Sequence, residues 1–359
     1  MINKNILEIC MSPDLGGLEL YMAKSSLFLN DCFNVTTVIN EGSKLEDYFK
    51  SKVEYKILQK KSNIFMFLSA RKLAKIIDTK EIELIHLHWT KDIPFVVLAK
   101  LISHKKPKII QSRHMTMTRY KDDFYHNFLY KNIELMLPVT KQVKEQLIKF
   151  IPESVRPKLE VLYVGSDELK KQELLKLQNS GFHIGMVGRI NREKGQHLLI
   201  EAVSILKSKG VTVNAHIVGN PMQESYLEEL KALVKDKKLE DRVFFLGFVK
   251  EPQAFYEACD VVVLASKKET FGLVLVEAMK VGVAVIGSNS GGVVEIIDNK
   301  KTGLLFESQN AKSLADSIEV LYKDETLKKS LAQEGQKKSN VLFSNKVQFP
   351  KLVEIITNL

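Results

Sequence analysis

Residues 261–281 read VVVLASKKETFGLVLVEAMKV, and this stretch decides the fold class. The apolar run Val261–Ala265 predicts a buried parallel strand, and Leu273–Val281 predicts a helix that begins after a short turn. Strand, turn and helix in this order form the repeating unit of a doubly wound α/β domain. Ligands of such domains are expected beyond the carboxyl ends of the strands.

Two glutamates set this turn apart chemically. Glu269 is expected on the turn and Glu277 one to two turns inside the helix. Between them, Phe271, Gly272 and Leu273 bring unpaired backbone N–H groups to a helix N-terminus, where anions bind readily. Sugar hydroxyls and a nucleotide diphosphate would use both the acceptors and the amides. A lone pair of glutamates at this spacing could equally be two surface residues on a helix.

Short apolar runs alternate with helical patterns along the whole chain, which predicts parallel sheets covered on both faces. The strands expected in the first half are Ile6–Met11, Val35–Asn40, Val53–Leu58, Leu84–Trp89, Lys108–His114, Leu135–Thr140 and Leu159–Gly165. Those expected in the second half are His183–Gly188, Val213–Gly219, Val243–Gly247, Val261–Ala265, Ala284–Ser288 and Gly303–Phe306. Helices such as Gln196–Ser208 and Tyr226–Lys235 fill the gaps, and Ser166–Gly181 is the expected linker. The predicted fold class is α/β, with two doubly wound Rossmann-like domains.

Length and composition agree with two globular domains. The 359 residues exceed what one hydrophobic core usually supports, and 45% hydrophobic with 27% charged residues is typical of a globular protein. No uninterrupted apolar run approaches the roughly 18 residues of a membrane-spanning helix, and the N-terminus predicts a strand rather than a signal peptide. Cys10, Cys32 and Cys259 lack metal-ligand spacing, which favours buried thiols in a reducing cytoplasm.

The net charge of +10 lies mostly in the first half of the chain. Residues 1–165 carry 26 Lys and Arg against 18 Asp and Glu, a balance of +8, whereas residues 166–359 carry +2. An anionic membrane surface, an anionic substrate or nucleic acid would each exploit this charge. No helix-turn-helix, zinc-finger or aromatic RNA-binding signature accompanies it, so nucleic acid is not expected as a partner.

A second constellation precedes the glutamates. Gly188 ends an expected strand, and Arg189 and Lys194 place two cations before the next helix. Charge-assisted hydrogen bonds are worth roughly 1.5–3 kcal/mol each, enough to hold a diphosphate leaving group without a metal ion. An isolated pair of this kind would more simply be a solvated basic turn. Its occurrence in the same half as the paired glutamates favours a binding site.

At these positions the chain resembles the family 4 retaining glycosyltransferases. The stronger motifs are Gly188-Arg189…Glu193-Lys194-Gly195, Glu269…Phe271-Gly272…Glu277-Ala278-Met279 and Gly291-Gly292…Glu295…Thr302-Gly303. The weaker motifs, in the first half, are Gly16-Gly17-Leu18-Glu19, His114 at a strand end and Gly165-Ser166-Asp167. The resemblance implies a GT-B fold, in which two Rossmann-like domains face a cleft. It implies an acceptor-side domain at residues 1–167, a donor-binding domain at 168–339 and a C-terminal helix within 340–359 that packs back on the first domain.

The resemblance also implies a role for each matched position. The donor-binding set is Gly16, Gly17, Gly188, Arg189, Lys194, Val249, Glu269, Phe271, Gly272, Leu273 and Glu277. Within it, Glu277 would accept hydrogen bonds from the ribose and Glu269 from the donor sugar, while the backbone near Val249 would contact the base. The catalytic set is Glu269, His114, Arg189 and Lys194.

Glu269 is expected to bind the sugar rather than to donate a proton. A helix N-terminus stabilises the ionised carboxylate, whereas a general acid needs a raised pKa. The two glutamates therefore do not fit a glycoside hydrolase. Transfer in the resembled family keeps the anomeric configuration, by front-face attack in which the leaving phosphate oxygen takes the acceptor proton.

The acceptor is expected near the strand that ends at His114. Arg113, Arg119 and Tyr120 would contact a glycan or glycolipid acceptor, although a solvated charged loop explains them equally and His114 could be structural. His86 and His88 share one face of a strand, but no third metal ligand is evident in the sequence. Histidines that line the cleft are therefore expected, and no metal site.

The segment Asn63–Ile77 predicts a basic amphipathic helix. Such a helix can lie on an anionic bilayer, although a core-facing helix with a solvated lysine face is the commoner explanation. Together with the basic first half, it favours a cytoplasmic enzyme that is peripheral on the inner face of the cell membrane.

The sequence thus predicts a retaining, hexosyltransferase-type glycosyltransferase that moves a sugar from a UDP- or GDP-sugar to an acceptor hydroxyl. Lipopolysaccharide or another surface glycan is the expected product. The donor is a co-substrate, and no cofactor or metal is expected. Two alternatives stay open: a nucleotide-sugar epimerase of the same architecture, and a non-catalytic nucleotide-sugar-binding partner protein.

Overall fold

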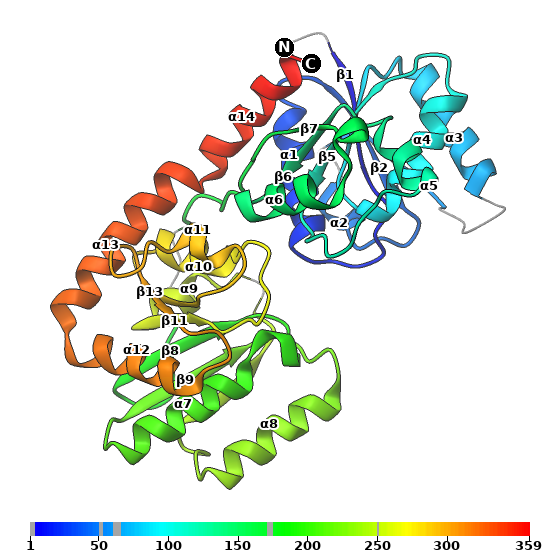
Figure 1. The fold of residues 1–359 in the computed structure, drawn as a ribbon. Helices are drawn as coiled ribbons and strands as arrows, with labels where there is room; N and C mark the ends of the chain where they lie inside the picture. Colours follow the sequence, from blue (N-terminus) through cyan, green and yellow to red (C-terminus); the bar gives the residue numbers. More distant parts are fainter. Residues whose placement is uncertain (1–3, 50–52, 60–65, 171–174, 250) are drawn as a thin grey trace. The chain divides into compact units, whose positions relative to one another are not determined.

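The computed structural model describes residues 4–49, 53–59, 66–170, 175–249 and 251–359. The chain forms two compact units (Figure 1). Unit 1 comprises Met1–Tyr163 and Gln348–Leu359, and unit 2 comprises Val164–Val347. In the part of the chain that is described, no helix is both long and apolar enough to cross a membrane.

Unit 1 is built on a seven-stranded parallel sheet with the strand order β3-β2-β1-β4-β5-β6-β7. Its strands are β1 (Asn5–Cys10), β2 (Asn34–Asn40), β3 (Tyr55–Leu58), β4 (Leu84–Leu87), β5 (Lys108–Arg113), β6 (Leu135–Pro138) and β7 (Lys158–Leu159). Its helices are α1 (Gly17–Leu29), α2 (Glu46–Phe49), α3 (Met66–Thr79), η2 (Thr90–Asp92), α4 (Ile93–Ile102), α5 (Phe124–Tyr130), α6 (Lys141–Phe150), η3 (Glu153–Val155) and most of α14 (Asn345–Thr357). The strand order reverses between β1 and β4, the kind of position where doubly wound sheets bind ligands.

Unit 2 has a six-stranded parallel sheet with the order β10-β9-β8-β11-β12-β13. Its strands are β8 (Phe182–Val187), β9 (Val213–Val218), β10 (Val243–Gly247), β11 (Val261–Leu264), β12 (Ala284–Ser288) and β13 (Leu304–Phe306). Its helices are η4 (Arg192–Lys194), α7 (Gln196–Ser208), α8 (Glu224–Asp236), α9 (Gln253–Glu257), α10 (Leu273–Lys280), α11 (Val293–Ile296), α12 (Ala311–Lys323) and α13 (Glu325–Leu342). Here the order reverses between β8 and β11.

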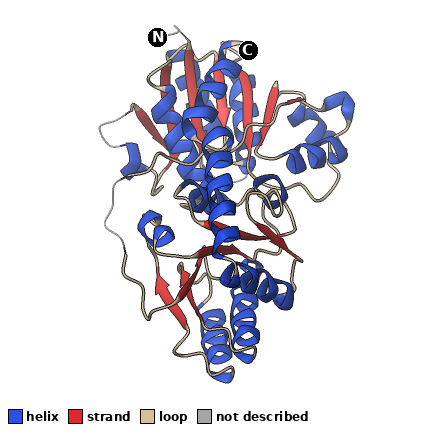
Figure 2. Cartoon of the chain, turned by 90° about the vertical axis from the view of Figure 1, so that its left-hand side faces the viewer, coloured by secondary structure: helices blue, strands red, loops and turns tan. Residues whose placement is uncertain are grey.

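Both faces of the unit 1 sheet are covered by helices (Figure 2). Successive residues of β1 point to opposite faces, so Leu7 and Ile9 join one core, with α3 and α4 side chains. Ile6 joins a second core together with Leu29 of α1, and Cys10 joins a third. The near-continuous apolar strands follow from this burial on both faces.

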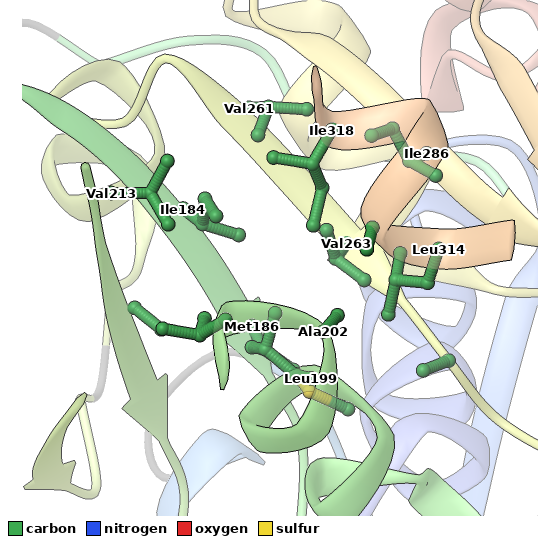
Figure 3. Packing of buried hydrophobic residues seen from close by; sticks show 14 of the residues in the cluster. Ile184, Met186, Leu199, Ala202, Val213, Val261, Val263, Ile286, Leu314 and Ile318 are labelled. Carbon is green, nitrogen blue, oxygen red and sulfur yellow. The ribbon is translucent and has the colours of Figure 1, made fainter. Parts of the chain in front are cut away.

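The core of unit 2 gathers side chains from the central strands and two helices (Figure 3). Ile184 and Met186 of β8 and Val261 and Val263 of β11 are almost completely buried. Residues of α7 and α12, among them Leu199 and Ile318, pack against them. Within this core β8 and β11 pair directly, with Val261 opposite Ile184 and Val262 opposite Gly185.

The predicted strands agree with the structure to within two residues at each end, except at the last strand of unit 1. The expected strand Leu159–Gly165 is wrong, because β7 ends at Leu159. Backbone N–H groups of Glu160 and Leu162 still donate to carbonyls of β6, but Pro138 has no N–H to donate back. The ladder therefore stops there.

The unit boundaries differ slightly from the expected domains. Unit 1 ends at Tyr163 rather than residue 167, and the chain returns to it at Gln348 rather than at residue 340. The C-terminal helix α14 packs Leu352 and Ile356 against Ile6 in unit 1. The expected linker contains no helix in its described residues, and residues 171–174 lie outside them.

Candidate active site

Lys194 and Glu269 meet at the carboxyl edge of the unit 2 sheet. Lys194 ends the short helix η4 after β8, and Glu269 lies in the loop after β11. The Lys194 Nζ atom lies 2.7 Å from Glu269 Oε2, and the two side chains are 28% and 16% exposed. Ser266 Oγ donates to the same carboxylate oxygen at 3.2 Å. Two sequence motifs 75 residues apart thus form one charged cluster at the point where the strand order reverses.

The backbone of Glu269 is held by the loop after β12. The Gly292 N–H donates to the Glu269 carbonyl at 2.8 Å. A Cβ on Gly291 would lie 2.1 Å from that carbonyl oxygen, and Gly291 has a positive φ of 63°. Only glycine fits there without displacing Glu269. The Gly291-Gly292 pair is therefore part of the support of the site.

The helix α10 begins directly after Glu269 with an open N-terminus. Its N-cap is Gly272, with a φ of 99°, and no side chain caps it. The side chain of Phe271 is buried and packs edge-on against Phe343, so this residue can offer only its backbone. The amides of Leu273 and Val274 have no acceptor within the helix, whereas the Leu275 N–H donates to the Gly272 carbonyl at 2.9 Å. The helix end is therefore uncapped, and anion binding there stays a prediction.

Glu277 lies on α10 and is bound by a residue that the sequence did not single out. Tyr256 of α9 donates its hydroxyl to Glu277 Oε2 at 2.9 Å. Tyr256 is 1% exposed, and burial together with the neighbouring Glu277 raises its pKa well above the ordinary value. The tyrosine stays protonated and orients the carboxylate.

Arg189 and Val249 lie on the loops that follow β8 and β10. The Arg189 side chain is exposed and has no ion-pair partner among the described residues. The loops after β8, β9 and β10 are tied together, since Gly219 N–H donates to the Gly247 carbonyl and Ile190 N–H to the Asn220 carbonyl. Val249 is half-buried, whereas the neighbouring Phe248 is exposed. Phe248, which the sequence analysis missed, presents an aromatic ring beside the position expected to meet the base.

In unit 1, Gly16 and Gly17 start α1 at the carboxyl edge of β1. Gly16 is the N-cap and has no side-chain cap hydrogen bond. A Cβ on Gly16 would lie 3.3 Å from Glu19 Oε2, whereas Gly17 has open space around it. This loop flanks the second point at which a strand order reverses.

Arg113 is not available to an acceptor, contrary to the prediction. Its guanidinium is 5% exposed and donates to the carbonyls of Met115 and Thr116 and to Thr90 Oγ1. The position of Arg113 at a strand end could be predicted from the sequence, but the direction of its side chain could not. In the structure the guanidinium points inward and orders the loop that follows. Arg119 and Tyr120 on that loop are exposed, as an acceptor contact requires.

His114 is partly exposed and its Nε2 atom is buried, with no hydrogen-bond partner among the described residues. The ring lies edge-on to Tyr21, with ring centroids 4.8 Å apart. Burial, reinforced by His88 and His86, lowers the pKa of His114 well below its ordinary value. His114 is therefore neutral at physiological pH.

The histidines expected to line a cleft do not do so. His86 and His88 are both completely buried. The sequence showed no third group near them, but Glu8 of β1 lies beside both.

Two family descriptions match separate parts of the chain. "Glycosyl transferases group 1" matches residues 170–338, and "Glycosyl transferase 4-like" matches residues 8–145. Together they cover most of both units. The chain belongs to the group 1 glycosyltransferases of family 4.

Relatives and solved structures agree with this glycosyltransferase assignment. The capsular polysaccharide biosynthesis glycosyltransferase CapM of Staphylococcus aureus is 26% identical over 351 residues, which cover 89% of this chain and 88% of the relative. A Campylobacter jejuni N-acetylgalactosaminyltransferase that acts on a diphospho-undecaprenol-linked sugar is 28% identical over 62% of this chain and 60% of its own length. The structure of Anabaena Alr3699/HepE in complex with UDP has a TM-score of 0.84 at 19% identity, with both chains covered completely.

The glycosyltransferase has the two-domain Rossmann-like GT-B fold, as the resemblance implied. The epimerase and the non-catalytic partner receive no support from these matches. Within unit 2 the structure brings Lys194 and Glu269 together and places Glu277 on α10, and their roles in donor binding stay predictions. The sequence analysis missed Tyr256, which has no periodic or motif signal and is recognisable only through its contact.

Proposed function

We propose that this glycosyltransferase moves a sugar from a UDP- or GDP-sugar to an acceptor hydroxyl with retention of the anomeric configuration. The observation that carries the proposal is the pairing of Lys194 with Glu269 beside the open N-terminus of α10. The site combines a cation, a carboxylate that accepts hydrogen bonds, and backbone amides at a helix N-terminus, all where the strand order reverses. The cation and the amides suit a diphosphate, and the carboxylate suits the hydroxyls of a sugar.

Unit 2 would hold the donor. Lys194 and the exposed Arg189 supply positive charge for the diphosphate, and the amides of Gly272 and Leu273 supply hydrogen-bond donors. Glu277, oriented by Tyr256, would accept from the ribose hydroxyls. Glu269 would accept from hydroxyls of the transferred sugar, and Phe248 and Val249 would meet the base.

The leaving diphosphate gains negative charge as the bond to the sugar breaks. Lys194 and Arg189 would stabilise that charge, and removal of one such group typically costs about 100- to 1,000-fold in rate. Two cations can serve this purpose without a metal ion, so we propose a metal-independent reaction. Glu269 is ion-paired with Lys194, and we propose that it binds hydroxyls of the sugar. The leaving phosphate oxygen would take the acceptor proton on the same face.

Unit 1 would bind the acceptor. His114, Arg119 and Tyr120 follow β5 at the carboxyl edge of the sheet, and Gly16 and Gly17 start α1 after β1. CapM, the Campylobacter enzyme and an Escherichia coli O-antigen biosynthesis glycosyltransferase, WclY, support a surface glycan as the product. Lipopolysaccharide is one member of that class.

We further propose that the enzyme is cytoplasmic and binds the inner membrane surface peripherally. The expected basic helix is α3, whose residues Ala70, Leu73 and Ile77 face the core, so its main face is not a membrane anchor. Residues 63–65 of that expectation lie outside the described residues.

A stronger candidate for membrane contact is α5. Phe124 is 89% exposed, and Tyr125 and Phe128 of the same helix are also exposed. Exposed aromatic side chains near Arg119 and Lys131 suit the interface of an anionic bilayer.

The experiment that tests the proposal combines binding and turnover. Thermal-shift titration with UDP, GDP and their sugar conjugates identifies the donor class, and incubation with labelled donor and lipid-linked or free glycan acceptors measures transfer. NMR of the product gives the anomeric configuration. Conversion of the donor in the absence of acceptor would indicate an epimerase, and absence of nucleotide binding would contradict the proposal.

A further inference from the structure

Glu8 is a charged residue in the middle of the buried strand β1. Its side chain is completely buried, and it points to the face that also carries Ile6 and Cys10. On that face the apolar core is divided in two, since Ile6 and Cys10 belong to separate clusters. The gap between them is polar. Burial of a carboxylate in such a place requires compensating partners.

Four side chains lie within hydrogen-bond distance of the Glu8 carboxylate, and Ser25 shares its single hydroxyl proton with the Met22 carbonyl at 3.0 Å. His86 Nδ1 lies 2.7 Å from Oε1, and His88 Nε2 lies 2.8 Å from Oε2. The hydroxyls of Ser25 and Ser26 lie 3.3 and 3.5 Å from Oε2. Burial alone would raise the pKa of Glu8, but the two histidines lower it to about 2. Glu8 is therefore ionised.

Glu8, His86 and His88 also carry the kinds of ligand atom that bind zinc, a carboxylate oxygen and imidazole nitrogens. Ligand atoms around a tetrahedral zinc ion lie about 3.3 Å apart, since each bond is about 2.0 Å long. The distances of 2.7 and 2.8 Å are those of charge-assisted hydrogen bonds. The geometry therefore favours a hydrogen-bonded network.

An ionised carboxylate only accepts hydrogen bonds, so it dictates where its partners carry their protons. His86 must carry a proton on Nδ1, and its Nε2 lies 2.8 Å from Ser112 Oγ. His88 must carry a proton on Nε2. Burial, together with His86, lowers the pKa of His88 to about 4, so His88 is neutral and its Nδ1 is bare. That Nδ1 atom is buried without a partner among the described residues.

This network lies directly beneath His114. Ser112 lies on β5 and His114 directly follows that strand, and the His88 and His114 rings are stacked, with centroids 6.3 Å apart. The ring of Tyr21 contacts both histidines, at 5.8 Å from His88 and 4.8 Å from His114. One of the two rings that pack beside His114 is therefore that of His88, which is bound to Glu8.

We propose that Glu8 is a positioning residue of the glycosyltransferase site, which fixes the tautomers of His86 and His88 and thereby the orientation of His114. The inference rests on the proposed function of His114 at the acceptor side. Glu8 itself touches no substrate. It acts as the hydrogen-bond partner that fixes which ring nitrogen of each histidine points a proton at the carboxylate.

The network is tested first in the unaltered protein by ¹⁵N NMR of histidine-labelled chains. His86 protonated on Nδ1 and His88 protonated on Nε2 are the expected signatures. His88 protonated on Nδ1, or stoichiometric zinc in the purified protein, would overturn the inference. This measurement needs no variant and therefore does not depend on whether a variant folds.

The second test is Glu8→Gln, whose amide must point an NH₂ group at one histidine and so force a change of tautomer. We expect turnover to fall about 10- to 100-fold, with the KM for the donor within twofold of the unaltered enzyme. Glu134→Gln is the matched control, since Glu134 lies just before β6 of the same unit and pairs with Lys100 of α4, outside the network. The control should keep both turnover and histidine spectra.

His114→Ala separates this inference from the proposed function. If His114→Ala keeps full turnover, the proposed role of His114 fails. If His114→Ala loses turnover while Glu8→Gln keeps both turnover and tautomers, the positioning role of Glu8 is overturned and the proposed function stands.

Discussion

Lys194 Nζ and Glu269 Oε2, 2.7 Å apart, neutralise each other at the edge where a nucleotide sugar is proposed to bind. Each side chain is thereby held in place before the donor arrives. A diphosphate would draw Lys194, and the hydroxyls of a sugar would replace Lys194 at Glu269. We therefore expect the pair to matter more for donor binding than for folding, because partly exposed ion pairs contribute little to the free energy of unfolding.

Lys194→Ala and Glu269→Ala should each lower kcat/KM for transfer by about 100- to 1,000-fold, because each removes a group that contacts the reacting part of the donor. The measurement is transfer of labelled sugar, with circular dichroism to verify folding. Lys209→Ala is the control, since Lys209 pairs with Asp316 and Glu319 on the surface of unit 2. Turnover near that of the control in both variants would refute the assignment.

Tyr256→Phe should raise the KM for the donor by roughly three- to tenfold, with little change in kcat. The hydroxyl orients Glu277, and one hydrogen bond is worth about 1 kcal/mol. Isothermal titration with the nucleoside diphosphate measures the same loss. Tyr322→Phe, which removes an exposed tyrosine hydroxyl elsewhere in unit 2, is the matched control. An unchanged affinity in Tyr256→Phe would mean that Glu277 does not contact the ribose.

Gly291→Ala should abolish most activity and destabilise unit 2. The positive φ alone costs about 1–2 kcal/mol for a residue with a Cβ, and the new methyl group would clash with the Glu269 carbonyl. Gly210→Ala is a close control, because Gly210 has a φ of 73° and open space around it. Thermal melting and transfer assays of both variants separate backbone strain from displacement of Glu269. Equal activity in the two variants would contradict the proposed support.

The stability of unit 2 should fall as the pH drops from 6.5 towards 4. His216 is completely buried, and burial together with His183 lowers its pKa to about 4. Below pH 6.5 the unfolded chain binds a proton at this histidine, whereas the folded chain does not. The free energy of unfolding therefore falls by up to about 1.4 kcal/mol per pH unit. Urea unfolding across this range should give a shallower slope for His216→Gln than for the control His104→Gln, which changes an exposed histidine. Parallel slopes would exclude His216 as the cause.

The triple variant Phe124→Ser, Tyr125→Ser, Phe128→Ser should reduce sedimentation with anionic liposomes at least tenfold. Each aromatic ring buries a large apolar area on insertion. Phe67→Ser with Leu68→Ser is the control, because both residues are exposed on α3 beside Arg71. Absence of binding at low salt in the unaltered protein would refute the membrane proposal.

The doubly wound fold of both units was predictable because apolar runs and helical periods are strong local signals. The expected helix Gln196–Ser208 and the strands Val243–Gly247 and Ala284–Ser288 are confirmed to the residue. The length of the edge strand β7 was overestimated. Pro138, which limits it, lies on the adjacent strand β6 and not within the apolar run that predicted β7.

Side-chain direction was the part that the sequence could not supply. Arg113 was expected to face a ligand and instead donates to its own loop. Glu8 was overlooked although a charge within the apolar run of β1 was a visible signal. Its meaning depends on the strand order that places His86 opposite it, and that order is a property of the tertiary fold.

The chain enters unit 2 after Tyr163 and leaves it before Gln348, so one half of the enzyme is carried as an insertion within the other. Residues 164–347 could therefore be exchanged between relatives as one continuous segment, while unit 1, which is proposed to bind the acceptor, stays unchanged. A laboratory chimaera should be joined at those two points. A cut that removes the last residues would strip Leu352 and Ile356 from the core cluster that contains Ile6 and expose part of that core.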